Sequence, residues 1–292
     1  RPRVADYLEL TKPRVAVLVL LTVAAGAVLA AGREVSLVVL VHAVFGTALV
    51  AAGASALNQW IERHRDGRMR RTHARPLPAG RLQPAEAVVF GIVLAVAGVG
   101  YLALTLPRPW AAAVAAVTFV CYVGVYTPLK ARTTLNTLVG AVPGALPPVI
   151  GWCAVRGSSP GPEAGALFLI LFVWQLPHFL AIAWMYRDEY ARAGLCMLPV
   201  RDPDGRRTAR HMIGYCLALI LASLVPVLLG AAGLLYLGGA LLLGLGFLAS
   251  ALEFGRLRSP RQARRVLRAS LLYLPGLLAL LLLDRALPWL TA

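Results

Sequence analysis

Charged residues are scarce in this chain of 292 residues: Asp, Glu, Lys and Arg together make up 14% of it, while hydrophobic residues make up 59%. So apolar a composition excludes an ordinary soluble domain. Cysteine is also rare, and the four that occur show no paired spacing of the kind that holds a metal ion. We expect buried, inert thiols at these positions, which are Cys121, Cys153, Cys196 and Cys216.

Long apolar runs dominate the rest of the sequence. A helix needs about 20 mostly apolar residues to cross a hydrocarbon core about 30 Å thick. The windows that qualify are 15–32, 36–58, 87–106, 110–127, 134–154, 165–186, 212–230, 232–250 and 270–290. They predict an all-α integral membrane protein of about nine transmembrane helices. The last three spans also admit a different division.

The formal net charge is +16, and its distribution carries more information than its size. Sorting all 29 Lys and Arg residues by loop puts 25 on one side of the membrane and 4 on the other, namely Arg33, Arg108, Arg156 and Arg285. The positive-inside rule then predicts a cytoplasmic N-terminus and an external C-terminus, which requires an odd number of spans. Topology and anionic lipid account for the basic excess, and we expect no nucleic-acid partner.

Two cytoplasmic segments, 58–80 after span 2 and 184–199 after span 6, share a pattern. Each passes from an acidic helix end to a Leu-Pro turn and carries basic residues. Because they lie four spans apart, we predict two related halves within a single transmembrane domain, 1–133 and 134–250. A basic loop and a ninth helix, 251–292, complete that domain.

Span 5 is rich in residues that disturb helices: Gly140, Pro143, Gly144, Pro147, Pro148 and Gly151. We therefore expect this span to be kinked or unwound. Loosened backbone at membrane depth is tolerated only against protein or a wet cavity.

Asn58, Glu62 and Asp66 are spaced four residues apart, so a continuing helix would place them in one stripe on one face. The two carboxylates would repel each other at a helix end whose dipole is already negative. Nearby arginines could compensate, or a hard divalent cation such as Mg²⁺ could bind there. Asp188 and Glu189 repeat this feature at the end of span 6, which favours metal binding by both acidic groups.

Basic residues follow the acidic stripe or share its side of the membrane. Guanidinium groups bind phosphate oxygens in pairs, and lysine adds a point charge. Carboxylates that hold Mg²⁺ beside such cations suit a diphosphate. For any single arginine, contact with a lipid headgroup is an equal alternative. The predicted diphosphate-binding residues are Arg71, Arg75, Lys130, Arg132, Lys12 and Arg14.

His178 lies in the apolar span 6, within the segment Trp-Gln-Leu-Pro-His-Phe. Ionisable groups inside the membrane are candidates for function, although a histidine can also serve helix packing. Its polar neighbours Gln175 and Pro177 indicate that this part of the span faces protein.

In these segments the sequence resembles the UbiA superfamily of intramembrane prenyltransferases, and more narrowly its haem O synthase (protoheme IX farnesyltransferase) branch. The matching segments cover the first two thirds of the chain, and beyond about residue 215 only the hydrophobic pattern agrees. These segments are DYLELTKPR at 6–14, RTHARPLPAG at 71–80, YTPLKARTTLNTLVGAVPGALPPVIGW at 126–152 and WQLPHFLAIAWMYRDEYARAG at 174–194.

The resemblance implies a nine-helix fold around a central cavity, in the inner membrane of the cell, with the active site facing the cytoplasm. It implies farnesyl diphosphate as donor, Mg²⁺ as cofactor, haem b as acceptor and haem o as product. Asn58, Glu62 and Asp66 match the first metal-diphosphate motif, and Asp188 and Glu189 fall in the second. The four-apart aspartates common in the second motif are replaced here by Tyr186 and Tyr190, which leaves the number of carboxylate ligands open.

Two other functions are compatible with parts of this sequence. A related prenyltransferase acting on an aromatic quinone precursor is disfavoured by the sequences around His178 and Asp188. A transporter, which also uses broken helices, is disfavoured because the acidic residues gather at one face instead of the bilayer midplane. His178 could ligate the haem iron or order the attacking water.

Overall fold

The computed structural model describes residues 3–32, 34 and 36–290, with only the backbone for 287–290. In these residues the secondary structure is helical and contains no strand, and nine helical segments are long and apolar enough to cross a membrane. The predicted all-α membrane fold is confirmed. Arg1 and Arg33, which entered the charge count, lie outside the described residues. The nine segments are α2 (Pro13–Ala31), α3 (Leu37–Asp66), α4 (Pro84–Thr105), α5 to α6 (Trp110–Leu129), α7 to α8 (Asn136–Arg156), α9 (Pro162–Met185), α11 (Arg206–Leu228), α12 (Leu234–Leu257) and α13 (Pro260–Leu290).

Several helices extend beyond the apolar windows. Helix α3 continues from the predicted end at 58 to Asp66, α11 begins at Arg206 instead of 212, and α13 begins at Pro260 instead of 270. A hydrophobic window detects only the part of a helix that suits hydrocarbon. Backbone hydrogen bonds continue into polar residues without interruption, so the sequence windows were too short at these ends.

The chain forms two compact units. The first unit contains Arg1–Pro160 and Glu189–Leu195, and the second contains Gly161–Asp188 and Cys196–Ala292. The first therefore includes the spans α2 to α8 and the short helix α1 (Arg3–Leu10), and the second includes α9, α11, α12 and α13. The repeat of two halves expected from the sequence, 1–133 and 134–250, stays a prediction.

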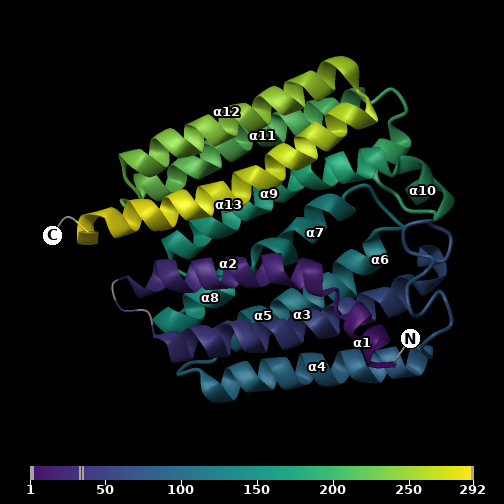
Figure 1. Ribbon diagram of the computed structural model, residues 1–292, viewed down its shortest axis with the longest axis horizontal. Helices are drawn as coiled ribbons and strands as arrows, with labels where there is room; N and C mark the ends of the chain where they lie inside the picture. The colour runs from purple at the N-terminus through teal and green to yellow at the C-terminus, as the bar shows by residue number, and fades with distance from the viewer. Residues whose placement is uncertain (1–2, 33, 35, 291–292) are drawn as a thin grey trace. The chain divides into compact units, whose positions relative to one another are not determined.

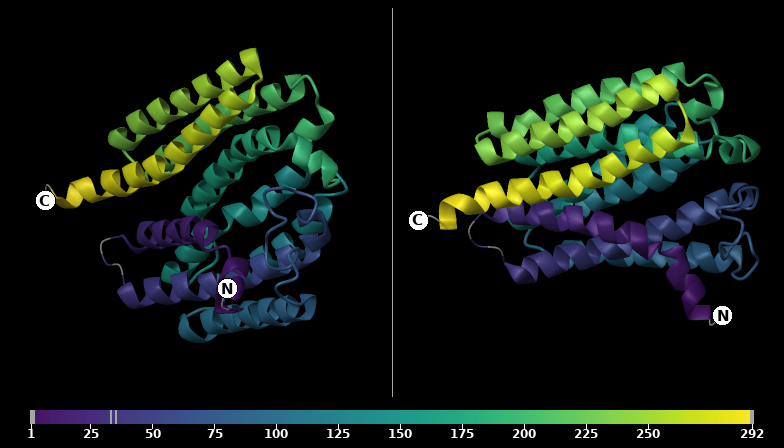
Figure 2. Two further views of the ribbon diagram at one scale, coloured as in Figure 1. Left: turned by 45° about the vertical axis from the view of Figure 1, so that its right-hand side comes forward. Right: turned by 45° about the horizontal axis from the view of Figure 1, so that its top comes forward.

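In the first unit α3 lies beside α4, and α2 packs along α8 (Figures 1 and 2). Two glycines allow α2 and α8 to approach closely. A Cβ atom at Gly26 would lie 2.0 Å from the carbonyl oxygen of Pro148, and one at Gly151 would lie 1.9 Å from that of Val23. Neither position can accept a side chain without separating the helices. Small residues at such crossings are a common basis of helix association in membranes.

Span 5 is broken, as its glycines and prolines predicted. Helix α7 (Asn136–Ala145) ends before Leu146, and α8 (Pro147–Arg156) begins directly after it. The first eight residues of α8 are buried, and this helix packs against α2, α3 and α5. The irregular backbone is therefore covered by protein.

Span 4 contains a feature that was not predicted from the sequence. Between α5 (Trp110–Val120) and α6 (Thr127–Leu129) the helix widens into a π-helix, η1, over Cys121–Tyr126. The hydroxyl of Thr127 donates a hydrogen bond to the carbonyl oxygen of Tyr122 at 2.8 Å. Short π-helical segments often occur at functional sites, and this one leads directly to Lys130.

In the second unit α12 lies beside both α11 and α13, and α9 packs against α11 and α13 (Figures 1 and 2). Helix α12 begins without a side-chain cap of its own. The carboxylate of Asp284 on α13 accepts hydrogen bonds from the backbone N–H groups of Gly233 and Tyr236 instead. A carboxylate at a helix N-terminus satisfies free donors and complements the helix dipole.

Candidate active site

The acidic stripe lies on the last turns of α3. Because α3 continues to Asp66, the four-residue spacing places Asn58, Glu62 and Asp66 along one face of a helix. All three are buried, with exposed fractions of 1%, 7% and 1%. A buried carboxylate requires a charged or hydrogen-bonding partner.

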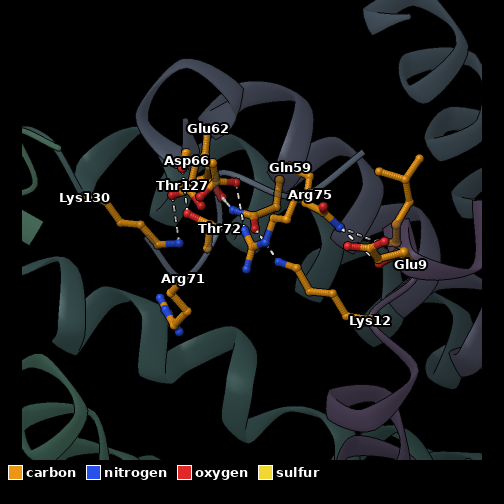
Figure 3. A network of polar contacts seen from close by, with 12 residues as sticks. Glu9, Lys12, Gln59, Glu62, Asp66, Arg71, Thr72, Arg75, Thr127 and Lys130 are labelled. Carbon is orange, nitrogen blue, oxygen red and sulfur yellow. Dashed lines mark hydrogen bonds and ion pairs between the residues drawn. The ribbon is translucent and has the colours of Figure 1, made fainter. Parts of the chain in front are cut away.

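Three cations supply those partners. Lys12 Nζ donates to Asn58 Oδ1 at 2.8 Å, Lys130 Nζ lies 2.8 Å from Glu62 Oε1, and Arg75 Nη1 lies 2.7 Å from Asp66 Oδ2. Figure 3 shows these cations reaching the end of α3 from separate segments of the chain. The structure thus unites all of the first acidic motif with Lys12, Arg75 and Lys130 of the predicted diphosphate-binding residues. We refer to these six residues as the ionic cluster.

Lys12 lies at the junction of α1 and α2 in a left-handed backbone conformation, with φ 51° and ψ 58°. This conformation is unfavourable for a residue with a side chain, so the surrounding structure must hold it. Arg81 contributes by binding α1 at two points: its guanidinium lies 2.7 Å from Asp6 Oδ1 and 2.8 Å from Glu9 Oε2. Gln59 on α3 also donates to the carbonyl oxygen of Leu10 at 2.9 Å. These contacts fix the end of α1 beside the acidic stripe.

Arg75 is positioned by the loop that follows α3. The Thr72 hydroxyl donates to the Asp66 carbonyl oxygen at 2.8 Å, and the Arg75 N–H donates to the Thr72 carbonyl oxygen at 3.0 Å. These bonds fold the loop back toward the helix end. Arg75 can therefore reach the Asp66 carboxylate with little further ordering.

Lys130 follows the π-helix and lies 4.6 Å from the ring centroid of Tyr126, a distance suited to cation–π attraction. Thr127, which is fully buried, accepts a hydrogen bond from Asn58 Nδ2 at 3.2 Å. Span 4 is thereby joined to α3 at the acidic stripe. Neither Thr127 nor Tyr126 was predicted from the sequence, because their role depends on the local π-helix.

The two lysines differ electrostatically. Burial lowers the pKa of Lys12 to about 7, and the charges of Arg75 and Lys130 contribute to this lowering. Burial would also lower the pKa of Lys130, but Tyr126 and the Glu62 carboxylate outweigh it and raise that pKa above its ordinary value. Lys130 therefore keeps its charge at neutral pH, whereas Lys12 can lose its proton there.

The second acidic motif is split between two environments. Glu189 accepts a hydrogen bond from the backbone N–H of Arg71 at 3.3 Å, and Arg71 Nη2 donates to the Tyr190 hydroxyl at 3.3 Å. Burial raises the pKa of Tyr190, which keeps the phenol protonated. The Asp188 side chain is 86% exposed and lies 3.8 Å from Arg187. Glu189 and Tyr190 thus hold the Arg71 segment, whereas Asp188 faces solvent.

Arg14 and Arg132 are exposed and lie outside the ionic cluster. Tyr190 was noticed in the sequence only as an aromatic residue at a position where aspartate is common. Its contact with Arg71 gives that substitution a physical role, since the ring also lies beneath the guanidinium at 5.9 Å.

His178 lies on α9 in the second unit. Its neighbours Gln175 and Pro177 are buried, as expected for a helix face turned toward protein. The ring of His178 stacks on that of Trp174, with centroids 5.0 Å apart, and its Nδ1 lies 2.7 Å from the Ser270 hydroxyl oxygen of α13. Ser270 was not predicted from the sequence.

The oxygen donors of the ionic cluster suit one type of metal site. In the residues described, no group of three or more His, Cys, Asp and Glu side chains is arranged to hold a metal ion. The described residues therefore form no cage made only of protein ligands. Mg²⁺ commonly binds through one or two carboxylates and completes its shell with water and substrate phosphates. Glu62 and Asp66, with the amide oxygen of Asn58, fit a metal that is shared with a diphosphate.

Comparisons with known proteins give a consistent result. A model of the UbiA prenyltransferase family matches residues 19–280. The chain is 49% identical over 289 residues to a protoheme IX farnesyltransferase of Solibacter usitatus, covering 96% of this chain and 98% of the relative. A structure of digeranylgeranylglyceryl phosphate synthase superposes with a TM-score of 0.81 at 16% identity, covering 98% and 99% of the two chains. A UbiA homologue from Archaeoglobus fulgidus bound to GPP and Mg²⁺ superposes with a TM-score of 0.65 at 17% identity, covering 94% and 99%.

Proposed function

The chain belongs to the UbiA prenyltransferase family, and on that premise we propose that it transfers a farnesyl group from farnesyl diphosphate to a vinyl group of haem b. Water adds in the same reaction, and the products are haem o and diphosphate. The observation that carries this proposal is the ionic cluster, in which three cations and the oxygens of Asn58, Glu62 and Asp66 meet at a membrane-helix end. The name of the relative that is 49% identical supports the choice of donor and acceptor.

The cations of the ionic cluster have a second set of partners in this reaction. When the diphosphate binds, Lys12, Arg75 and Lys130 turn from the protein oxygens to the phosphate oxygens. Guanidinium and ammonium groups stabilise the charge that develops on a departing diphosphate. Mg²⁺, when held by Asn58, Glu62 and Asp66, would further neutralise that charge. When the cations of the ionic cluster move to the diphosphate, the oxygens of Asn58, Glu62 and Asp66 become available to Mg²⁺.

The remaining predicted residues take other roles in the proposed reaction. We propose that Glu189 places Arg71 for diphosphate binding through the backbone contact described above. Asp188 is the other carboxylate of the second motif and faces solvent. Arg14 and Arg132 extend the cationic surface that attracts the donor. In the acceptor site His178 contacts the haem, either at the iron or through the attacking water.

The reaction balances without an oxidant. The C1–O bond of farnesyl diphosphate breaks, and diphosphate leaves with the electron pair. The vinyl group donates its electrons to C1, which forms the new carbon–carbon bond and leaves a cation beside the porphyrin ring. Water adds to this cation and loses a proton, which gives the hydroxyl group of haem o. Excluding water until the carbon–carbon bond has formed protects the farnesyl cation.

The protein is a multi-pass membrane protein, and we propose that it lies in the cell inner membrane with its N-terminus and ionic cluster on the cytoplasmic side. The distribution of basic residues supports this orientation. A reporter that is active only in the cytoplasm should work when fused at the N-terminus and fail when fused after position 292. The reverse result would contradict the proposed orientation and would not bear on the proposed reaction.

The function is tested with purified protein in lipid nanodiscs supplied with farnesyl diphosphate, haem b and MgCl₂. We expect release of diphosphate together with a haem product that carries one farnesyl and one hydroxyl group, identified by mass spectrometry. Turnover of 4-hydroxybenzoate in place of haem b would support a quinone-type prenyltransferase instead. Uptake of substrate into vesicles without diphosphate release would support a transporter. Either result would overturn the proposal.

A further inference from the structure

Ser270 on α13 is fully buried and contacts two side chains of α9. Its carbonyl oxygen accepts a hydrogen bond from the indole N–H of Trp174 at 2.8 Å, and its hydroxyl oxygen lies 2.7 Å from His178 Nδ1. Trp174 and His178 are four residues apart on one helix face, and their rings stack at an interplanar angle of 28°. A single serine therefore fixes both members of a stacked pair.

The hydrogen bonds of Ser270 favour one position for the imidazole proton of His178. A serine hydroxyl has one proton to donate, and a backbone carbonyl can only accept. The Ser270 hydroxyl lies 2.7 Å from the carbonyl oxygen of Leu267, to which it donates. Both contacts are satisfied together when the hydroxyl donates to Leu267 and accepts from His178, an arrangement that places the imidazole proton on Nδ1. A neutral imidazole with its proton on Nδ1 has a free electron pair on Nε2.

This tautomer is the one that a metal-binding histidine requires when Nε2 is the ligand. Histidines that bind metals usually donate their other ring N–H to a protein acceptor, which fixes the orientation of the ring and raises its basicity. Stacking on Trp174 also resists rotation of the ring. A histidine that serves packing alone does not need its proton held on one particular nitrogen.

We infer that Ser270 is a positioning residue that holds His178 in the Nδ1-protonated form, so that Nε2 serves as a ligand for the iron of the haem acceptor. This inference rests on the proposed function for the identity of the ligand. The proton assignment itself rests on the contacts of Ser270 alone. The two parts can therefore fail separately.

The proton assignment is tested without haem. Protein labelled with ¹⁵N-histidine in nanodiscs should give a His178 signal with a protonated Nδ1 and an unprotonated Nε2, assigned by its loss in His178→Gln. In Ser270→Ala the two tautomers should become mixed, and Ser270→Thr should restore the wild-type pattern. A wild-type signal with the proton on Nε2 would refute the inference directly, whatever the behaviour of the Ser270 variants.

Iron ligation is tested by titrating the same proteins with haem b and recording the absorption spectrum. We expect His178→Gln to lose the spectrum of histidine-ligated iron. Ser270→Ala should weaken haem binding by about tenfold while leaving the affinity for farnesyl diphosphate unchanged. Ser250→Ala is the matched control, because the Ser250 hydroxyl on α12 also donates to a carbonyl oxygen three residues earlier, that of Phe247.

Unchanged iron ligation in His178→Gln, with haem o still produced, would overturn the inference and leave the proposed function intact. If the wild-type protein binds haem b with histidine ligation but forms no haem o, the proposed function fails and the ligand site stands. Equal haem affinity in the wild-type protein and Ser270→Ala would show that Ser270 has only a packing role.

Discussion

The polar contacts of the ionic cluster and those between the spanning helices of the second unit are of different kinds. In the first unit the ionic cluster brings charged groups together at the end of α3. In the second unit the buried polar contacts between α9, α11 and α13 are neutral: Trp174 and His178 bond to Ser270, and the hydroxyl groups of Ser223 and Tyr273 bond to each other. Buried charges carry a desolvation cost that neutral hydrogen bonds largely avoid. This difference agrees with the proposals made above: the ionic cluster suits a charged ligand, and the neutral contacts suit packing and a ligand that needs an uncharged nitrogen.

Removal of divalent metal should have the largest effect on turnover. It tests the proposed role of the ionic cluster. Because Lys12, Arg75 and Lys130 occupy the oxygens that Mg²⁺ would use, Mg²⁺ alone should bind weakly. Diphosphate should raise its affinity by more than tenfold, and by linkage Mg²⁺ should raise the affinity for diphosphate equally. Calorimetric titration with and without inorganic diphosphate measures both effects, and chelation should abolish turnover. Equal Mg²⁺ affinity in the two titrations would contradict the exchange of partners.

Asp66→Ala should have the second largest effect on activity. It removes a proposed metal ligand and leaves Arg75 without its carboxylate, so kcat/KM for farnesyl diphosphate should fall by at least about a hundredfold. Glu253→Ala is the control, since Glu253 is a partly exposed carboxylate that pairs with Arg265 on neighbouring helices. Normal kinetics in Asp66→Ala at saturating Mg²⁺ would exclude Asp66 from the metal site.

Arg75→Ala should raise KM for farnesyl diphosphate by at least about tenfold, because a hydrogen bond to a charged group contributes roughly 1.5–3 kcal/mol. Arg75→Lys should restore only part of the loss, since the paired N–H donors of the guanidinium are missing. Arg108→Ala, an exposed arginine at the other predicted membrane face, is the control. Full recovery in the lysine variant would reduce the role of Arg75 to its charge.

Asp202→Ala should have the smallest effect and should change stability without changing kinetics. The Asp202 carboxylate in the second unit accepts bonds from the backbone N–H and the hydroxyl of Thr208, both at 2.7 Å, at the start of α11. Loss of such a cap costs about 1 kcal/mol in the free energy of unfolding. Unfolding in detergent, followed by circular dichroism, measures the change. A large loss of activity would show that this carboxylate is more than structural.

The same carboxylate predicts a pH dependence. Burial would raise the pKa of Asp202, but the hydrogen bonds from Thr208 and from the Arg207 backbone outweigh it and lower the pKa. A lowered pKa means that the stabilisation is complete above the unfolded value, about 3.9, and is lost as the pH falls through the folded value. The difference in unfolding free energy between wild-type protein and Asp202→Asn should therefore be constant near neutral pH and shrink below about pH 4.

The sequence allowed the spans, the break in span 5 and the acidic stripe to be predicted, because each follows from local composition or from a spacing of four residues. The partner of each charge could not be predicted. Lys12 reaches Asn58 only because α1 is held by Arg81 and the chain turns through a left-handed conformation. Such pairings depend on contacts between segments that are distant in sequence.

Two other features had no sequence signal. The π-helix over Cys121–Tyr126 lies in a run of apolar and aromatic residues that an α-helix would also accept. Ser270 is one serine in a long apolar helix, and its importance depends on its position opposite Trp174 and His178. Asp188 and Glu189 are adjacent in sequence but meet different surroundings, because neighbouring residues of a helix point in different directions.

The segment Glu189–Leu195 belongs to the first unit although the chain on both sides of it belongs to the second. During synthesis the ribosome therefore releases α9 before it releases the carboxylate and the phenol that hold the Arg71 loop. The first unit is left incomplete while the next part of the protein is already entering the bilayer. A gene divided after Pro160 would encode a first fragment that lacks Glu189 and Tyr190. The second fragment would have to supply the segment Glu189–Leu195 to the first to complete that unit.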